Sequence, residues 1–105
     1  METEATARSV SIDILIRFDE EGELSYSTAN ELESRERGRV REYVQNILRR
    51  RSYLDFVINE FSSIQVEEMK PLLKNVLRLG LYELLFMSGT PDYASINEAV
   101  DIAKY

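Results

Sequence analysis

The sequence contains no cysteine and no histidine among its 105 residues. Without cysteine there is no disulfide, thiolate metal site or thiol nucleophile, so the compartment is not indicated by redox chemistry. The lack of histidine removes the usual general base near neutral pH and the commonest metal ligand. There is also no glycine-rich phosphate loop, no metal-ligand spacing and no pair of carboxylates in an apolar setting. We therefore expect no catalytic residue, no metal site and no cofactor in this chain.

Proline and glycine are scarce, with two and four residues respectively. Strand-type alternation of apolar and polar residues is weak, which favours an all-α class. A chain of this length is expected to form one domain, residues 1–105, and to bury a core without disulfides or metals. Neither a signal peptide nor a membrane-spanning run is visible, so we expect a cytoplasmic protein with no membrane partner.

The stretch 70–87, KPLLKNVLRLGLYELLFM, predicts the helix around which the others are arranged. Pro71 suits the first helical turn, where its missing N–H leaves no bond unmade. Apolar residues cover most of the circumference of residues 71–87, as is typical of a buried helix. Gly80, on the apolar side, predicts close approach of a second helix. The polar minority shares one arc and predicts a seam that reaches the surface: Lys74, Asn75, Arg78 and Tyr82.

Amphipathic spacing predicts further helices before and after this one. They cover residues 4–18, 24–33 (short), 35–50, 52–61 and from Thr90 onward. Ser34 and Ser52 are expected to be N-caps. Together these segments predict a bundle of about five to six helices.

The formal net charge of −6 argues against a surface that binds nucleic acid everywhere. Residues 35–51 are the exception, because they carry seven Arg against two Glu. Apolar spacing gives the helix over 35–50 a core face of Val40, Tyr43, Val44, Ile47 and Leu48. On a helical wheel the opposite side gathers Arg35, Arg39, Asn46, Arg49 and Arg50. Guanidinium groups bind phosphates bidentately, so this stripe predicts an anion-binding face. A solvated, salt-bridged helix is the alternative that charge alone leaves open.

Two C-terminal runs, VLRLGLYELLF (76–86) and PDYASINEAVDIAK (91–104), resemble the two-part signature of the NusB-like RNA-binding fold. Arg8 and the run ILRRRSYLDFVI (47–58) are similar to the matching earlier segments. The resemblance covers almost the whole chain and implies a NusB-like helical bundle. In that family a further helix follows the AK motif. Since this final helix is missing here, we expect residues 1–105 to be a fragment of a longer chain.

Two branches share this fold. One is the N-terminal domain of RsmB-type (Sun family) methyltransferases, which methylate C5 of a cytosine in small-subunit ribosomal RNA using S-adenosylmethionine. The other is the NusB transcription antitermination factor, which binds leader RNA together with a ribosomal protein. The acidic segment 1–34 and the runs 46–62 and 69–87 favour the methyltransferase branch. That resemblance implies a non-catalytic RNA-binding module that helps to position ribosomal RNA, with S-adenosylmethionine bound in a catalytic domain outside this chain.

Two alternatives stay open, an antitermination factor and a protein-interaction module without RNA binding. The resemblance implies RNA-binding roles for Arg8, Arg78 and Tyr82, although the motif that carries Arg78 and Tyr82 is largely structural. The helical wheel adds the candidates Arg39, Arg49, Arg50 and Lys74. Expected partners are RNA and a ribosomal protein. The groove left by the missing helix predicts a homodimer.

Overall fold

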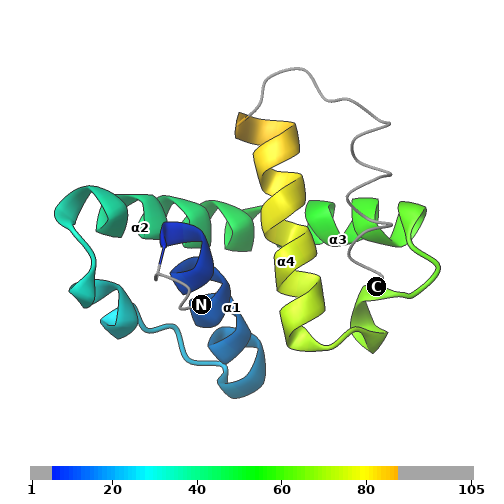
Figure 1. The fold of residues 1–105 in the computed structure, drawn as a ribbon. Helices are drawn as coiled ribbons and strands as arrows, with labels where there is room; N and C mark the ends of the chain where they lie inside the picture. The colour runs from blue at the N-terminus through cyan, green and yellow to red at the C-terminus, as the bar shows by residue number, and fades with distance from the viewer. Residues whose placement is uncertain (1–5, 88–105) are drawn as a thin grey trace, which may run out of the picture. The chain divides into compact units, whose positions relative to one another are not determined.

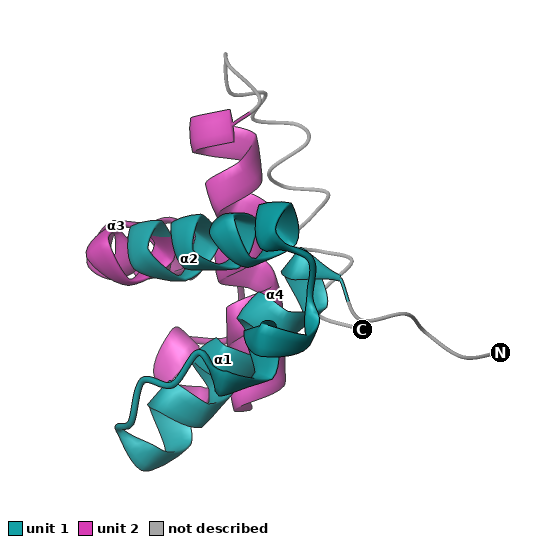
Figure 2. Ribbon diagram, turned by 90° about the vertical axis from the view of Figure 1, so that its left-hand side faces the viewer, with its two compact units in different colours: residues 1–46 teal, residues 47–105 magenta. Residues whose placement is uncertain are grey.

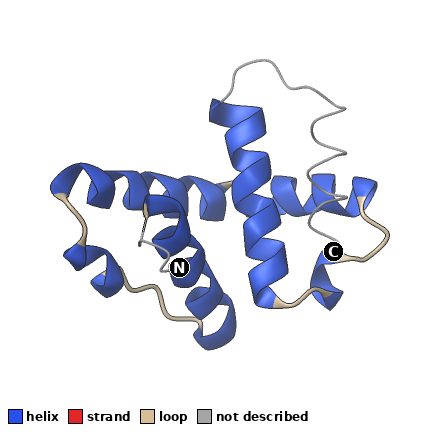
Figure 3. Cartoon of the chain, viewed as in Figure 1, coloured by secondary structure: helices blue, strands red, loops and turns tan. Residues whose placement is uncertain are grey.

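The computed structural model describes residues 6–87 and divides the chain into two compact units, 1–46 and 47–105 (Figure 2). Every regular element within residues 6–87 is helical, which confirms the all-α prediction (Figure 3). The described part holds four α-helices, fewer than the number predicted for the whole chain. The helix predicted from Thr90 onward lies outside the described residues. A single domain over 1–105 stays a prediction.

The element order runs from α1 to η3 (Figure 1). The elements are α1 (Ala7–Glu21), η1 (Ser27–Glu31), α2 (Ser34–Arg49), α3 (Arg51–Phe61), η2 (Val66–Glu68), α4 (Pro71–Tyr82) and η3 (Glu83–Met87). Of these, η1 and η2 are 3-10 helices and η3 is a π-helical turn that continues α4. No helix within residues 6–87 has the length and apolar character needed to cross a membrane.

Helix α1 is fixed at both ends by local hydrogen bonds. At its start the Ser9 N–H donates to Thr6 Oγ1 (3.1 Å) and the Thr6 N–H donates to Ser9 Oγ (2.9 Å), a capping box. At its end Gly22 adopts φ 71°, and its N–H donates to the carbonyl of Phe18 at 2.8 Å. Glycine takes this left-handed conformation at no steric cost, so the helix continues to Glu21, beyond the predicted end at residue 18. The buried face consists of Ala7, Val10, Ser11, Ile14 and Leu15.

The helix predicted over 24–33 is reduced to the 3-10 turn η1. Ser25 Oγ accepts the N–H of Ser27 at 3.3 Å and donates to Ser27 Oγ at 3.1 Å. Side-chain bonds of this kind compete with the helical backbone pattern. Only Ala29 of this turn is buried, and Leu24 stays 43% exposed, so the segment has little apolar burial to stabilise a longer helix.

Helices α2 and α3 are separated by a single residue, Arg50, which occupies the N-cap position of α3 with φ −103° and ψ 13°. The prediction of Ser52 as N-cap is therefore wrong, because Ser52 lies inside α3. The same holds for Ser34, which is already the first residue of α2. Of the five residues predicted for the core face of α2, Val40, Tyr43, Val44 and Ile47 are buried and Leu48 is half-buried.

Helix α4 begins at Pro71 as predicted, but its polar arc points the other way. Asn75, Arg78 and Tyr82 are buried at 0%, 4% and 5% exposure, whereas Leu72 and Val76 are 60% and 40% exposed. The predicted surface seam is thus wrong for these three polar residues. The reason is a polar partner on α3, described below, which apolar periodicity does not reveal.

No helix among residues 6–87 approaches Gly80 closely. A Cβ built at this position would meet no heavy atom within 4 Å among the described residues, and Gly80 itself is half-buried. The core of unit 2 consists instead of larger apolar side chains from α3, η2 and α4: Leu54, Val57, Ile58, Val66, Met69, Leu77, Leu79 and Leu81.

Candidate nucleic-acid interface

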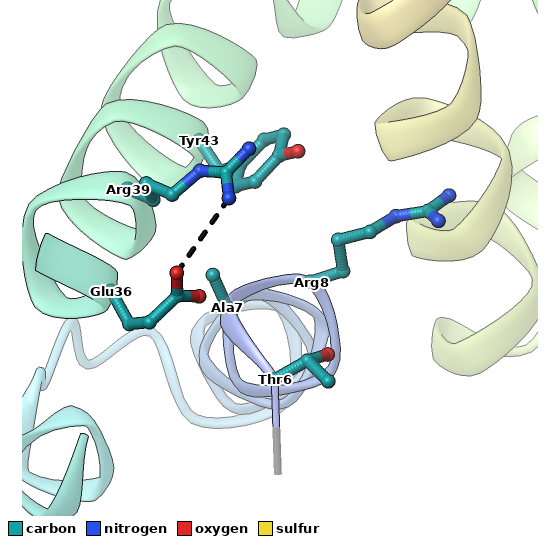
Figure 4. A pocket seen from close by; sticks show the side chains of 6 residues that line it. All are labelled: Thr6, Ala7, Arg8, Glu36, Arg39 and Tyr43. Carbon is teal, nitrogen blue, oxygen red and sulfur yellow. Dashed lines mark ion pairs between the residues drawn. The ribbon is translucent and has the colours of Figure 1, made fainter. Parts of the chain in front are cut away.

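A pocket of about 250 Å³ lies beside the N-terminus of α1 in unit 1 (Figure 4). Helix α1 and its cap supply Thr6, Ala7 and Arg8, and α2 supplies Glu36, Arg39 and Tyr43. Two of the predicted RNA-binding residues, Arg8 and Arg39, therefore line the same pocket.

Among the described residues that line the pocket, two are arginines and one is a glutamate. Arg39 Nη1 lies 3.6 Å from Glu36 Oε1, and the two side chains are 55% and 32% exposed. A loose pair in this much water contributes about 0–1 kcal/mol, so it does not prevent Arg39 from pairing with a phosphate. Arg8 extends from α1 away from the Glu36 carboxylate (Figure 4). The positive end of the α1 dipole adds to the attraction for an anion.

Arg78 is placed very differently, inside unit 2. Its Nε and Nη2 donate to Asp55 Oδ1 and Oδ2 at 2.8 and 2.9 Å, and its Nη1 donates to Asn75 Oδ1 at 3.1 Å. The Arg78 side chain is only 5% exposed. This bidentate pair joins α4 to α3, so the structure gives Arg78 a role in holding unit 2 together rather than a position at the surface.

Arg50 and Tyr82 belong to an aromatic cluster in unit 2, which we define as Arg50, Tyr53, Tyr82 and Phe86. The Arg50 guanidinium lies 4.6 Å from the centroid of the Phe86 ring. Tyr82 stacks on Phe86 with centroids 5.8 Å apart, and Tyr53 meets Phe86 edge-on at 6.3 Å. Sequence reasoning missed Tyr53 and Phe86. Phe86 was counted among the buried apolar residues of 71–87, and the π-helical turn that carries it has no signal in the periodicity.

The remaining candidates are not among the residues that line the pocket. Arg49 is exposed at the end of α2, and Lys74 is half-buried in α4. The predicted residues thus form one group in unit 1, Arg8 and Arg39, and another in unit 2. No group of acidic side chains within residues 6–87 is arranged to hold a metal ion.

The regular elements of residues 6–87 are all helical, and unit 1 holds a pocket lined by two arginines. The chain belongs to the NusB family, whose sequence profile matches residues 5–105. This confirms the resemblance seen in the two C-terminal runs.

Relatives from both predicted branches are similar to the chain. It is 31% identical to the "Probable ribosomal RNA small subunit methyltransferase B" of Bacillus subtilis, over 94% of this chain and 23% of that protein. It is 34% identical to the "Transcription antitermination protein NusB" of Shewanella pealeana, over 61% of this chain and 47% of that protein. The protein of the same name from Myxococcus xanthus is 35% identical over 78% of this chain and 61% of its own length.

The chain therefore spans between about a quarter and three fifths of the length of these three relatives. No solved structure matches it.

Proposed function

We propose that this chain is a non-catalytic RNA-binding module of a small-subunit ribosomal RNA methyltransferase, and that it helps to position the RNA. The observation that carries this proposal is the extent of the similarity to the Bacillus subtilis methyltransferase B, which runs over 94% of this chain. Transfer of the methyl group, and binding of S-adenosylmethionine, would belong to another part of the parent protein.

The geometry of the pocket in unit 1 supports an RNA ligand. Arg8 and Arg39 both line this pocket, and Glu36 is the only carboxylate among the described residues that line it. Guanidinium groups match phosphate oxygens in pairs of hydrogen bonds. A backbone phosphate that enters this pocket would replace the loose contact between Arg39 and Glu36 at little cost.

A titration of RNA affinity against salt concentration tests this proposal. For single-stranded RNA each phosphate contact contributes a slope of roughly −0.7 to log affinity against log salt. The double substitution Arg8→Ala and Arg39→Ala should weaken binding of a ribosomal RNA fragment and lower the slope by about 1.4, because two contacts are lost.

Arg17→Ala is the matched control. Arg17 is also an exposed arginine of α1, but it lines a second hollow together with Asp13, Glu20 and Glu21. Its acidic surroundings repel phosphate, so this variant should bind RNA like the unmodified chain. If Arg17→Ala weakened RNA binding as much as the double variant, the loss of affinity would reflect net charge alone. That result would contradict the assignment of the pocket as an RNA-binding site.

An antitermination factor is the second candidate, favoured by the relatives named NusB, which match up to 78% of this chain in the examples above. This candidate predicts that a ribosomal protein strengthens binding of a short leader RNA. Affinity measured with and without that protein distinguishes the two candidates. An increase of about tenfold or more, equivalent to roughly 1.4 kcal/mol, would favour antitermination, and no change would favour the methyltransferase module.

A further inference from the structure

The aromatic cluster of unit 2 has an open side. Tyr53 is 52% exposed and Phe86 is 43% exposed, whereas Tyr82 beneath them is 5% exposed. Tyr82 stacks on Phe86 with an interplanar angle of 25°, and Tyr53 stands at 74° to Phe86. Large rings that remain half in water while touching each other form a surface with apolar faces available to a flat ligand.

Three elements hold this cluster in place before any ligand arrives. Tyr53 lies on α3, two positions before Asp55, whose carboxylate binds Arg78 of α4 at 2.8 and 2.9 Å. Phe86 lies in η3, and π-helical turns of this kind occur frequently at functional sites. Because the rings already contact one another, binding a ligand here would order few side chains, which lowers the entropic cost of association.

The charge around the rings indicates the chemistry of the ligand. Three arginines in a row, Arg49, Arg50 and Arg51, immediately precede Ser52 and Tyr53, and the Arg50 guanidinium lies 4.6 Å from the centre of the Phe86 ring. Rings flanked by cations suit a ligand with flat apolar faces and a negatively charged backbone. An aliphatic peptide segment would use the rings but not the arginines. The combination therefore favours nucleotides.

We propose that the aromatic cluster of Arg50, Tyr53, Tyr82 and Phe86 is a stacking platform for unpaired bases of the bound RNA. The proposal rests on the RNA-binding function proposed above and adds a site on unit 2 to it. Tyr53 presents the more exposed ring to a base, and the neighbouring arginines pair with the adjoining phosphates. Bases within a duplex already stack on both faces, so a duplex cannot use this surface.

Binding of a mixed-sequence single-stranded RNA of about 12 nucleotides, compared with its duplex, tests the proposal. The unmodified chain should prefer the single strand. Tyr53→Ala should weaken single-strand binding roughly 5- to 100-fold, the range for loss of one stacked base, and leave the slope against salt unchanged. Tyr53→Phe should retain the affinity because the ring is what stacks. Phe56→Ala is the matched control, since Phe56 lies on the same helix and is 59% exposed but has no ring contact within residues 6–87.

A fluorescence measurement gives an independent readout. The chain contains no tryptophan, so Tyr53→Trp introduces a single one at the platform, and its emission should be quenched when the single-stranded RNA binds. The platform would be overturned if the emission of the tryptophan did not change, or if Tyr53→Ala left the RNA affinity unchanged. It would also be overturned if Phe56→Ala lowered the affinity as much as Tyr53→Ala, or if the duplex bound as tightly as the single strand.

The failures of the two proposals are distinguishable. If the unmodified chain binds neither RNA, the RNA-binding function itself is contradicted. If RNA binding depends on Arg8 and Arg39 while Tyr53→Ala has no effect, only the platform is contradicted. If Tyr53→Ala abolishes binding of a ribosomal protein and leaves RNA affinity intact, the cluster belongs to a protein interface and the platform is overturned.

Discussion

Arg39 in unit 1 and Arg78 in unit 2 occupy opposite environments, one exposed and loosely paired, the other buried and tightly paired. In unit 1, Arg39 is 55% exposed and lies 3.6 Å from the Glu36 carboxylate. In unit 2, Arg78 is 5% exposed and makes two hydrogen bonds of 2.8 and 2.9 Å to Asp55. Both arginines were candidates for RNA binding, Arg78 from the family resemblance and Arg39 from the helical wheel. The difference shows that charge on a helix indicates a binding surface only when the opposite helix offers no carboxylate.

The contrast also separates stability from binding. A loose exposed pair contributes little to folding, and its arginine is able to exchange one anion for another. A buried bidentate pair is strongly destabilised when one partner is removed, because the other charge is left without compensation. We therefore expect substitutions in unit 1 to change affinity, and substitutions at the buried pair of unit 2 to change the free energy of unfolding.

Asp55→Ala should give the largest effect. We expect a loss of about 3 kcal/mol in the free energy of unfolding, at the low end for a buried ion pair, because the Asp55 side chain is 25% exposed. Urea denaturation followed by circular dichroism measures this loss. The double variant Asp55→Ala and Arg78→Leu should recover much of it, since no unpaired charge then remains.

Glu36→Ala is the control for that experiment, because it breaks the exposed pair of unit 1. This substitution should lower the free energy of unfolding by less than about 1 kcal/mol. If Glu36→Ala and Asp55→Ala destabilise the protein equally, the distinction between an exchangeable and a structural arginine is lost.

Much of the fold could be predicted from the sequence, because apolar spacing reports which face of a helix is buried. The face formed by Val40, Tyr43, Val44 and Ile47 is an example, and all four are buried as predicted. The start of α4 at Pro71 is another, since proline lacks the N–H that a helix interior needs. These features depend on residues that are close in the chain, and local patterns describe them well.

Features that depend on a distant partner were not predictable in the same way. The buried polar arc of α4 requires Asp55, which lies on another helix and has no special spacing from Arg78. The aromatic cluster depends on the π-helical turn η3, which changes the direction of Phe86 without any change in composition. Of the candidate site, Arg8 and Arg39 were named as separate candidates, but that they line one pocket follows only from how α1 and α2 are arranged in unit 1.

Substitution of two glycines, one in each unit, should have the smallest effects on stability. Gly22 in unit 1 has φ 71°, whereas Gly80 in unit 2 lies inside helix α4. Gly22→Ala forces a Cβ into the left-handed region and should cost about 1 kcal/mol. Gly80→Ala should instead gain about 0.5–1 kcal/mol, because alanine favours the helix and a Cβ there meets no heavy atom of residues 6–87 within 4 Å. Thermal unfolding should shift by a few degrees in opposite directions, and a downward shift for both variants would mean that the backbone at Gly80 is closely covered after all.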